Sequence, residues 1–199
     1  MAVNLVMKPK ISEAEYLQGE LCSELKHELI DGEVYAMAGA SKNHERIAIN
    51  MSVKLHSHLQ NSPCEAFSTE VKVKVGKNFF YPDAMVVCND ETENQYYSEA
   101  PTLLAEVLSK SSRRNDETVK RWAYQSIPSL QEYILIEQDF VDVEVCRKKA
   151  GWVPMHYFLG DEFTLESIGL SLAVAEIYAR VQNEDMAAYL RDGRSGNAE

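Results

Sequence analysis

The sequence predicts a single α/β (α+β) domain with a central mixed β-sheet flanked by helices. Three observations support this class: two long segments with helical periodicity, several short apolar runs typical of strands, and a length of 199 residues. Hydrophobic residues make up 45% of the chain and charged residues 26%, close to the averages of globular proteins. We assign residues 1–180 to this domain and residues 181–199 to a C-terminal polar tail, whose last few residues we expect to be disordered.

The first part of the chain predicts a short helix, a hairpin and a long helix. Ser12 is suited to cap a helix over residues 11–21, and Asp31-Gly32 favours the tight turn of a β-hairpin. Ser41 is suited to cap the long helix that follows. The buried stripe of the long helix should consist of His44, Ile47, Ala48, Met51, Leu55 and Leu59.

Short apolar runs further along the chain predict the strands of the sheet. Val and Lys alternate over residues 71–75, which is typical of a half-exposed strand, and two further apolar runs carry Asp83 and Glu106. We expect the strands of Asp83 and Glu106 to be neighbours in the sheet. Additional strands are predicted over residues 133–136, 141–145 and 152–158, and a short helix over residues 174–179.

A second long helix is predicted over residues 113–126. Its apolar stripe comprises Val119, Trp122, Ala123 and Ile127. Asp116, Lys120 and Tyr124 fall on a different face of this helix. Spacing alone favours a structural explanation of Lys120, because Asp116 and Glu117 lie at the separations of surface ion pairs.

The overall charge and the length of the apolar runs exclude several classes of protein. The formal net charge of -11 opposes broad attraction to nucleic-acid phosphates, so any such contact must be local. No apolar run is long enough to span a bilayer, and residues 1–10 lack the pattern of a secretory signal, so we expect a cytoplasmic protein with no membrane partner. Cys22, Cys64, Cys88 and Cys146 are scattered, which favours free buried thiols.

Two carboxylates on apolar strands are the most informative feature of the sequence. An ionised carboxylate on a buried strand is costly unless it is paired or binds a cation, so Asp83 and Glu106 suggest one shared divalent metal. Mg²⁺, with Mn²⁺ as the alternative, suits two carboxylates because it retains several waters. A nearby ammonium would orient an attacking water, and Lys120 is the candidate. Asp83 taken alone has a structural alternative, since Asp after Pro82 is common in turns.

Several segments of the chain together resemble a known family. They are Glu28-Leu29-Ile30-Asp31-Gly32-Glu33, Gly39-Ala40-Ser41 with His44, Tyr81-Pro82-Asp83, Glu106-Val107-Leu108-Ser109, and Asp116 with Lys120 and Tyr124. In this order they resemble the "putative restriction endonuclease" family of the PD-(D/E)XK nuclease superfamily over nearly the whole chain. The resemblance implies a restriction-endonuclease-like fold in which Asp83, Glu106 and the carbonyl of Val107 bind the metal and Lys120 orients the hydrolytic water.

Two positions depart from the pattern of these nucleases. The superfamily has Lys two residues after the acid, where this chain has Leu108, and the resemblance implies that the lysine has moved to the next helix as Lys120. The family commonly has Pro where this chain has Lys110. Glu28, as an upstream acid, and His44, as a phosphate contact, are accessory candidates; a solvated hairpin carboxylate and a packing histidine are the alternatives.

The sequence therefore predicts a Mg²⁺-dependent endonuclease that hydrolyses DNA. Lys72, Lys74, Lys110 and Arg113 are candidates to bind the substrate, although scattered surface lysines give the same pattern. We expect a homodimer, because a twofold pair of sites suits the two strands of a duplex. The alternative function is a catalytically inactive nuclease-fold module for binding or assembly, which Leu108 and the acidic net charge both favour.

Overall fold

Six strands form the largest β-sheet of the computed structural model, which describes residues 10–89, 94–110 and 112–195. They are β3 (Cys64–Ser68), β6 (Ala84–Cys88), β8 (Pro101–Leu108), β9 (Glu132–Glu137), β10 (Val143–Arg147) and β11 (Pro154–Tyr157). Their order is β11-β10-β9-β8-β6-β3, with β8 and β9 parallel and the other neighbours antiparallel. The sheet is therefore mixed, as the sequence predicts, and β6, which directly follows Asp83, adjoins β8, which carries Glu106.

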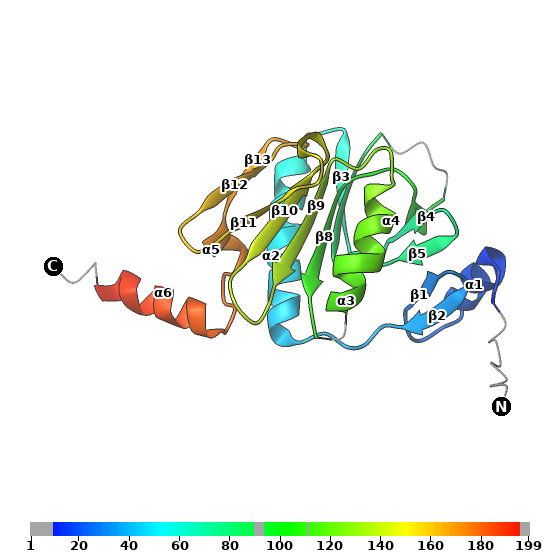
Figure 1. Ribbon diagram of the computed structural model, residues 1–199, viewed down its shortest axis with the longest axis horizontal. Coiled ribbons are helices and arrows are strands. Elements are labelled where there is room, and N and C mark those ends of the chain that lie inside the picture. Colours follow the sequence, from blue (N-terminus) through cyan, green and yellow to red (C-terminus); the bar gives the residue numbers. More distant parts are fainter. Residues whose placement is uncertain (1–9, 90–93, 111, 196–199) are drawn as a thin grey trace, which may run out of the picture.

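A second sheet lies beside the first and carries the N-terminal hairpin (Figure 1). Its strands are β1 (His27–Ile30), β2 (Glu33–Ala36), β4 (Lys72–Val75), β5 (Asn78–Phe80) and β7 (Tyr97–Ser98), in the order β2-β1-β5-β4-β7. A separate antiparallel pair consists of β12 (Glu162–Leu165) and β13 (Leu170–Ala173).

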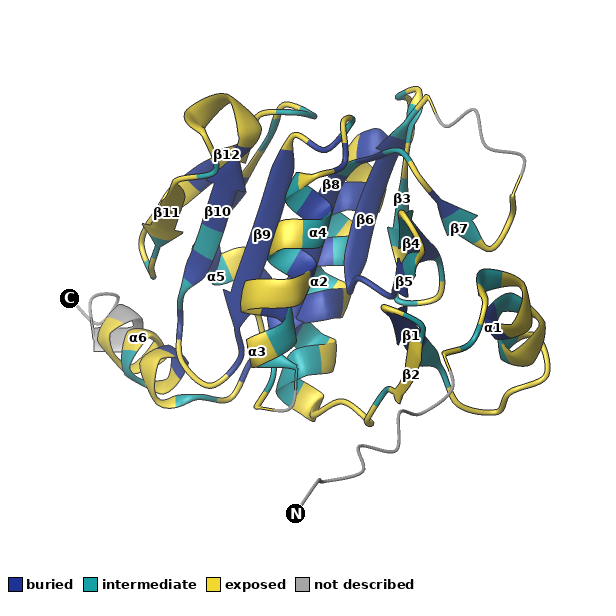
Figure 2. Ribbon diagram, turned by 45° about the vertical axis from the view of Figure 1, so that its right-hand side comes forward, coloured by how far each residue is buried: buried dark blue, intermediate teal, exposed yellow. Residues whose placement is uncertain are grey.

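Helices cover both faces of the six-stranded sheet (Figures 1 and 2). The helical elements are α1 (Glu13–Glu20), α2 (Lys42–Leu59), α3 (Arg113–Asn115), the π-helical turn η1 (Asp116–Lys120), α4 (Arg121–Gln125), the 3-10 turn η2 (Lys148–Ala150), α5 (Val174–Ile177) and α6 (Glu184–Ser195). The long helix α2 packs on one face of the sheet, and α4 packs on the opposite face. The α3–η1–α4 run thus follows β8 directly and lies over it.

The alternation of side chains along β8 decides which residues face which helix. Ala105 and Val107 belong to the apolar cluster that includes α2, whereas Leu104 and Leu108 belong to the cluster that includes α4. Successive side chains of a strand point to opposite faces of the sheet. Glu106 therefore lies on the α4 face.

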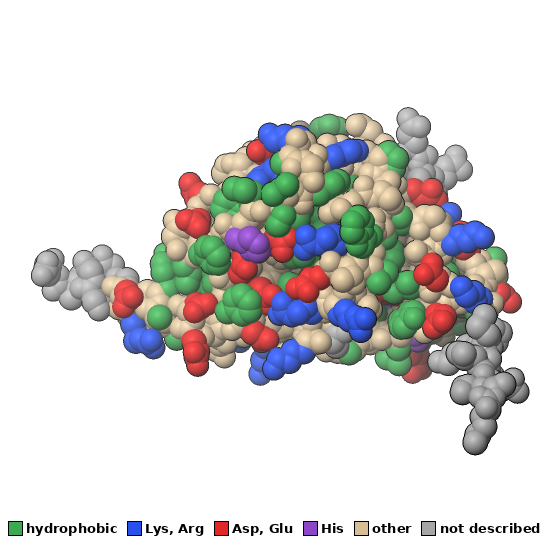
Figure 3. All heavy atoms as spheres, viewed as in Figure 1, with side chains coloured by type: hydrophobic (Ala, Val, Ile, Leu, Met, Phe, Trp, Pro, Cys, Tyr) green, Lys and Arg blue, Asp and Glu red, His purple; other side chains and the backbone are tan. Residues whose placement is uncertain are grey.

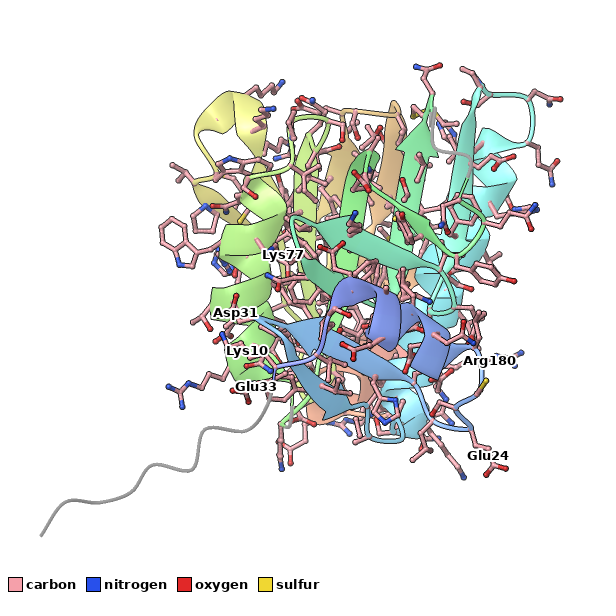
Figure 4. All side chains as sticks on the ribbon, turned by 90° about the vertical axis from the view of Figure 1, so that its right-hand side faces the viewer. Lys10, Glu24, Asp31, Glu33, Lys77 and Arg180 are labelled. Carbon is pink, nitrogen blue, oxygen red and sulfur yellow. A yellow bond between two sulfur atoms is a disulfide. The ribbon has the colours of Figure 1, made fainter. Side chains whose placement is uncertain are left out.

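The caps and turns near the N-terminus agree with the sequence predictions. The Ser12 hydroxyl accepts a hydrogen bond from the N–H of Glu15, and the Glu15 carboxylate accepts one from Ser12 in return, which closes a capping box on α1. At the turn between β1 and β2, Asp31 has φ 51° and Gly32 has φ 81°, as a tight hairpin turn of this kind requires. Figure 4 shows Asp31 next to Lys10 at this turn.

Some elements differ from the sequence predictions. The pattern does not predict β3, β12 or β13, because these short segments mix polar and apolar side chains and form no long apolar run. Asp83 lies in the link between β5 and β6 and not on a strand, since Pro82 has no N–H to donate to a strand ladder. The predicted strand over residues 152–158 forms as β11, at the sheet edge, with most of its residues exposed.

The cysteines correct the expectation of free buried thiols. Cys64 and Cys88 lie directly opposite each other on β3 and β6 and form a disulfide, with Cα atoms 4.1 Å apart. Cys22 is a free thiol but is exposed. Cys146 alone among the four is both free and buried, as the sequence analysis predicts.

The segment after residue 180 contains a regular helix. In Figure 1, α6 extends outward from the end of the sheet, and the Asp185 carboxylate near its start accepts a 2.8 Å hydrogen bond from the N–H of Val141. Met186 is buried. The predicted disorder concerns residues 196–199, which lie outside the described ranges. No helix within those ranges is long and apolar enough to cross a membrane.

Candidate active site

Four carboxylates and one lysine meet on the α4 face of the six-stranded sheet. Glu28 comes from β1, Asp83 from the link before β6, Glu106 from β8, and Asp116 and Lys120 from η1. All five residues are buried, with exposures of 7%, 8%, 3%, 1% and 4% in that order. We call these five residues the acidic cluster.

The Lys120 ammonium lies between three members of the acidic cluster. Its Nζ is 2.8 Å from Oε1 of Glu28, 3.1 Å from Oε1 of Glu106 and 3.2 Å from Oδ1 of Asp116. Oε1 of Glu28 also accepts a 3.1 Å hydrogen bond from the main-chain N–H of Tyr81. Buried ion pairs persist only where such additional partners satisfy them. The interpretation of Lys120 as a surface lysine, and of Glu28 as a solvated carboxylate, is therefore wrong.

The helix that carries Lys120 differs in part from the sequence prediction, because only Ala123 and Ile127 of its predicted apolar stripe pack against the core. Trp122 is 75% exposed and Val119 is 38% exposed, whereas Lys120 and Tyr124 are buried. The polar side of the helix faces the sheet because carboxylates from neighbouring elements provide partners for it. The π-helical turn from Asp116 to Lys120 carries two members of the acidic cluster, a common place for this rare conformation.

The position of Asp83 depends on the pairing of β6 with β8. The residue after Asp83 lies opposite the residue before Glu106, so the two carboxylates reach the same level of the sheet. Oδ2 of Asp83 accepts a 2.7 Å hydrogen bond from the main-chain N–H of Val107. Nε2 of His44 lies 3.4 Å from the same oxygen, which places the first turn of α2 against the acidic cluster. The structure thus brings Asp83, Glu106 and His44 together.

Glu106 is buried between two hydrogen-bond donors. The Tyr124 hydroxyl donates to its Oε1 over 2.8 Å, and Lys120 donates to the same oxygen. Burial raises the pKa of Glu106 well above its ordinary value; Lys120 opposes this shift, and the charges of Asp116 and Asp83 add to it. Burial, reinforced by the Glu106 charge, also raises the pKa of Tyr124, so its hydroxyl remains a donor.

The acidic cluster holds more negative charge than its single ammonium neutralises. Burial disfavours the charged form of Lys120, but the three neighbouring carboxylates outweigh burial and raise its pKa well above the ordinary value. Burial likewise raises the pKa of Asp116. For His44, burial lowers the pKa, but the hydrogen bond to Asp83 and the charges of Asp83, Glu45 and Asp116 together outweigh burial and raise the pKa. Under such conditions buried carboxylates retain a proton or take up a cation.

The donor set suits Mg²⁺, which typically takes one or two carboxylates and keeps several waters. Within the described residues, no group of three or more His, Cys, Asp or Glu side chains is arranged to hold a metal ion. The Lys120 ammonium lies among three of the carboxylates. Asp83 and Glu106 each use one oxygen for the hydrogen bonds above. Oδ1 of Asp83 and Oε2 of Glu106 receive no hydrogen bond from the described part of the chain, so each carboxylate retains one oxygen for an ion.

The basic residues predicted to bind substrate are mostly engaged within the protein. Lys72 is buried and donates a 3.1 Å hydrogen bond to the Tyr81 hydroxyl. Lys74 and Arg113 each form ion pairs with two glutamates. Lys110 is exposed in the loop after β8. On the face shown in Figure 3, acidic and basic side chains of the described residues are interspersed and form no separate basic surface.

Asp116 and Tyr124 are site residues that the sequence analysis does not assign a role. Spacing explains Asp116 as one half of a surface ion pair, and Asp116 and Tyr124 both belong to the segments that resemble the family. The available signal is their spacing: Asp116, Lys120 and Tyr124 are separated by four residues each and so share one helix face. A polar helix face next to a carboxylate on a buried strand indicates that this face is turned inward.

Comparison with known structures defines the class of the fold. A crystal structure described as "a putative nuclease belonging to DUF820" from Anabaena variabilis ATCC 29413 superimposes with a TM-score of 0.72 and 19% sequence identity. The match covers 86% of this chain and 99% of that chain. The protein therefore shares the mixed α+β fold of that structure, with helices flanking its sheets.

Sequence comparison then identifies the family. The model of the Uma2 family, described as "Putative restriction endonuclease", matches residues 13–175, and the chain belongs to this family. The Synechocystis sp. protein slr1290 is 37% identical over 176 residues, which cover 85% of this chain and 92% of the relative. The protein sll1609 of the same organism is 38% identical over 143 residues, 69% of this chain and 81% of the relative. The "putative restriction endonuclease" family inferred from the sequence motifs is thus confirmed.

Proposed function

We propose that this protein is a divalent-metal-dependent endonuclease that hydrolyses the phosphodiester bonds of DNA. The observation that carries the proposal is the approach of Asp83 to Glu106 with a lysine ammonium 3.1 Å from the Glu106 carboxylate. These are the groups that metal-assisted phosphoryl hydrolysis requires: acidic ligands, and a cation beside them. Membership of a nuclease family supports a nucleic-acid substrate.

Each residue of the acidic cluster has a role in this proposal. Asp83, Glu106 and the main-chain carbonyl of Val107 would hold Mg²⁺, or Mn²⁺ in its place. When bound, the ion would polarise a phosphoryl oxygen and lower the pKa of the attacking water. Lys120 would orient that water through its Nζ and offset the charge that develops on the phosphate. Glu28 supports the reaction as an accessory residue that holds Lys120 in place.

His44 and the basic residues would contribute to substrate binding. His44 lies at the first turn of α2 beside Asp83, where a phosphate bound near the metal could accept a hydrogen bond from its ring. Lys110 is the basic candidate best placed to meet DNA, because it is exposed just beyond the end of β8. Lys72, Lys74 and Arg113 would first have to exchange their present partners for phosphate.

Cleavage of plasmid DNA tests the proposed activity. The wild-type protein should cut supercoiled DNA in Mg²⁺ or Mn²⁺ and not in EDTA, and Asp83→Ala and Glu106→Ala should abolish cutting while circular dichroism shows a retained fold. Glu65→Ala, which removes an exposed carboxylate from β3, is the matched control and should cut normally. Unchanged cleavage by both site variants would contradict the assignment. A wild-type protein that neither binds metal nor cuts would instead be a nuclease-fold binding or assembly module.

The oligomeric state and the cellular location extend the proposal. A twofold homodimer would present one site to each strand of a duplex. Light scattering of the full chain should then give twice the monomer mass, and a monomer mass would contradict the dimer. The cytoplasmic location stays a prediction, which fractionation of cells that express the tagged chain would test.

A further inference from the structure

The two oxygens of the Glu106 carboxylate are not equivalent. Lys120 and Tyr124 both donate to Oε1, over 3.1 Å and 2.8 Å. No donor reaches Oε2 from the part of the chain that the structure describes. A carboxylate held in this way presents one oxygen to the protein and the other to whatever occupies the site.

Of the two donors, Tyr124 is the one committed to Glu106. The Lys120 ammonium is shared with Glu28 and Asp116, so its contact with Glu106 varies with the charge on two other carboxylates. The Tyr124 hydroxyl makes its hydrogen bond to Glu106. Tyr124 therefore provides the more constant constraint on the orientation of the carboxylate.

The packing of the Tyr124 ring fixes the position of its hydroxyl. Tyr124 is fully buried, and its ring meets Phe80 and Tyr133 edge-on at centroid distances of 5.4 Å and 5.3 Å. Aromatic contacts of this geometry add stability beyond that of the buried area. The ring would keep this position without its hydroxyl, because none of these ring contacts involves the oxygen.

We propose that Tyr124 is a positioning residue, which holds the Glu106 carboxylate so that Oε2 faces the metal-binding position beside Asp83. The inference rests on the proposed function, because it requires Glu106 to be a metal ligand. Without the hydroxyl, Lys120 would be the remaining donor to Glu106 within the described residues, and the carboxylate could turn both oxygens toward the ammonium. Loss of a hydrogen-bond partner of a ligating group typically weakens metal binding by ~10–100-fold.

Two buried tyrosines allow a matched experiment. Tyr124→Phe removes one oxygen atom and keeps the ring. Tyr178→Phe is the control: Tyr178 is also fully buried, but it packs on the α2 face, and its hydroxyl donates to the main-chain carbonyls of Glu137 (2.7 Å) and Asp142 (3.0 Å). Both variants lose a buried hydroxyl, so both should unfold at a lower temperature than the wild type.

The deciding measurement is the affinity of the full chain for Mn²⁺ alone, by isothermal titration calorimetry without DNA. Tyr124→Phe should bind Mn²⁺ at least ~10-fold more weakly than the wild type. Tyr178→Phe should bind like the wild type. An unchanged affinity in Tyr124→Phe would overturn the proposal, and so would an equal loss in the two variants, since that would reflect only the loss of a buried hydroxyl.

The same experiment separates this inference from the proposed function. If the wild type binds Mn²⁺ but does not cut DNA, the nuclease proposal fails while the affinities of the two variants still decide the role of Tyr124. If it cuts, Tyr124→Phe should recover kcat at saturating Mn²⁺ with an unchanged KM for DNA. A kcat loss that persists at saturating metal would overturn the positioning role, and a wild type without Mn²⁺ affinity would overturn both proposals.

Discussion

Nζ of Lys120 lies 2.8 Å from Oε1 of Glu28, and this contact joins the N-terminal hairpin to the helical run that follows β8. The hairpin belongs to the five-stranded sheet, whereas Lys120 lies over the six-stranded sheet. The same Glu28 oxygen accepts the N–H of Tyr81, two residues before Asp83. The acidic cluster therefore links the two sheets as well as forming the candidate active site.

Removal of the lysine should make stability depend on pH. Lys120→Met leaves buried carboxylates without their cation, so the pKa values of Glu106 and Asp116, already raised by burial, should rise further. Groups with a folded pKa above the unfolded value of about 4 contribute stability that is complete below that value and is lost as the pH rises through the folded pKa. In metal-free urea unfolding, the variant should thus fall further below the wild type at pH 8 than at pH 5.

An exposed lysine provides the control for that experiment. Lys54 pairs with Glu176 at the surface, and Lys54→Met should change stability by about 0–1 kcal/mol with little dependence on pH. A deficit of Lys120→Met that stays constant from pH 5 to pH 8, or that shrinks, would contradict the electrostatic account of the acidic cluster.

The substitution Asp83→Asn should weaken metal binding without a large effect on the stability of the fold. Asn in place of Asp83 can still accept the hydrogen bond from the N–H of Val107 through its side-chain oxygen, so Asp83→Asn should retain most of the wild-type stability. The amide lacks the negative charge that Mg²⁺ and Mn²⁺ favour in a ligand. Isothermal titration calorimetry should show greatly weakened Mn²⁺ binding, whereas thermal unfolding should show only a small change in the melting temperature. Wild-type Mn²⁺ affinity in Asp83→Asn would remove Asp83 from the ligand set.

Substitutions on the two sides of the helical run should reveal its orientation. Trp122 is exposed, so Trp122→Ala should change the free energy of unfolding by no more than about 0.5 kcal/mol. Ile127, from the same predicted stripe, is buried, and Ile127→Ala should cost about 2–5 kcal/mol. Denaturant titration measures both. A large loss of unfolding free energy in Trp122→Ala would contradict this orientation, because it would mean that the indole is buried in solution.

The cysteines should differ in their reaction with iodoacetamide. Burial raises the pKa of Cys146 to about 12, so almost no thiolate is present at pH 8 and alkylation should be slow. Cys22 is exposed and should react readily. Peptide mass spectrometry of the native, non-reduced protein should find Cys22 labelled and Cys64 linked to Cys88. Labelling of Cys64 without prior reduction would contradict the disulfide.

The sequence identifies the metal-binding candidates but not the full cluster around them. Asp83 and Glu106 can be found because a carboxylate within an apolar run is unusual, and β6 and β8 are predicted as neighbours because they are successive apolar runs in the sequence. The contact of Glu28 with Lys120 could not be predicted, since it depends on how a distant hairpin packs against the helical run. No local pattern encodes such a contact.

The orientation of the helical run shows why hydrophobic periodicity failed there. Periodicity places the apolar stripe inward because burial of apolar surface is favourable. It cannot register that Glu28 and Glu106 offer partners to Lys120, which reverse the preference at this one place. The strands β3, β12 and β13 were missed for a different reason: their pairing with neighbours, more than their own composition, makes them strands.

The π-helical turn η1 makes the structure sensitive to the number of residues in this part of the chain. An α-helix rotates by about 100° per residue, and a π-helical turn accommodates one residue more than an α-helical turn. Loss of a single residue from η1 would therefore restore regular α-helical winding and change the spacing of the residues within the turn. Deletion of a residue between Asp116 and Lys120 would reduce their separation from four residues to three and so alter the 3.2 Å contact between them, even though neither side chain had been exchanged. Among natural relatives, insertions and deletions should accordingly be rarer between residues 113 and 124 than in the neighbouring loops.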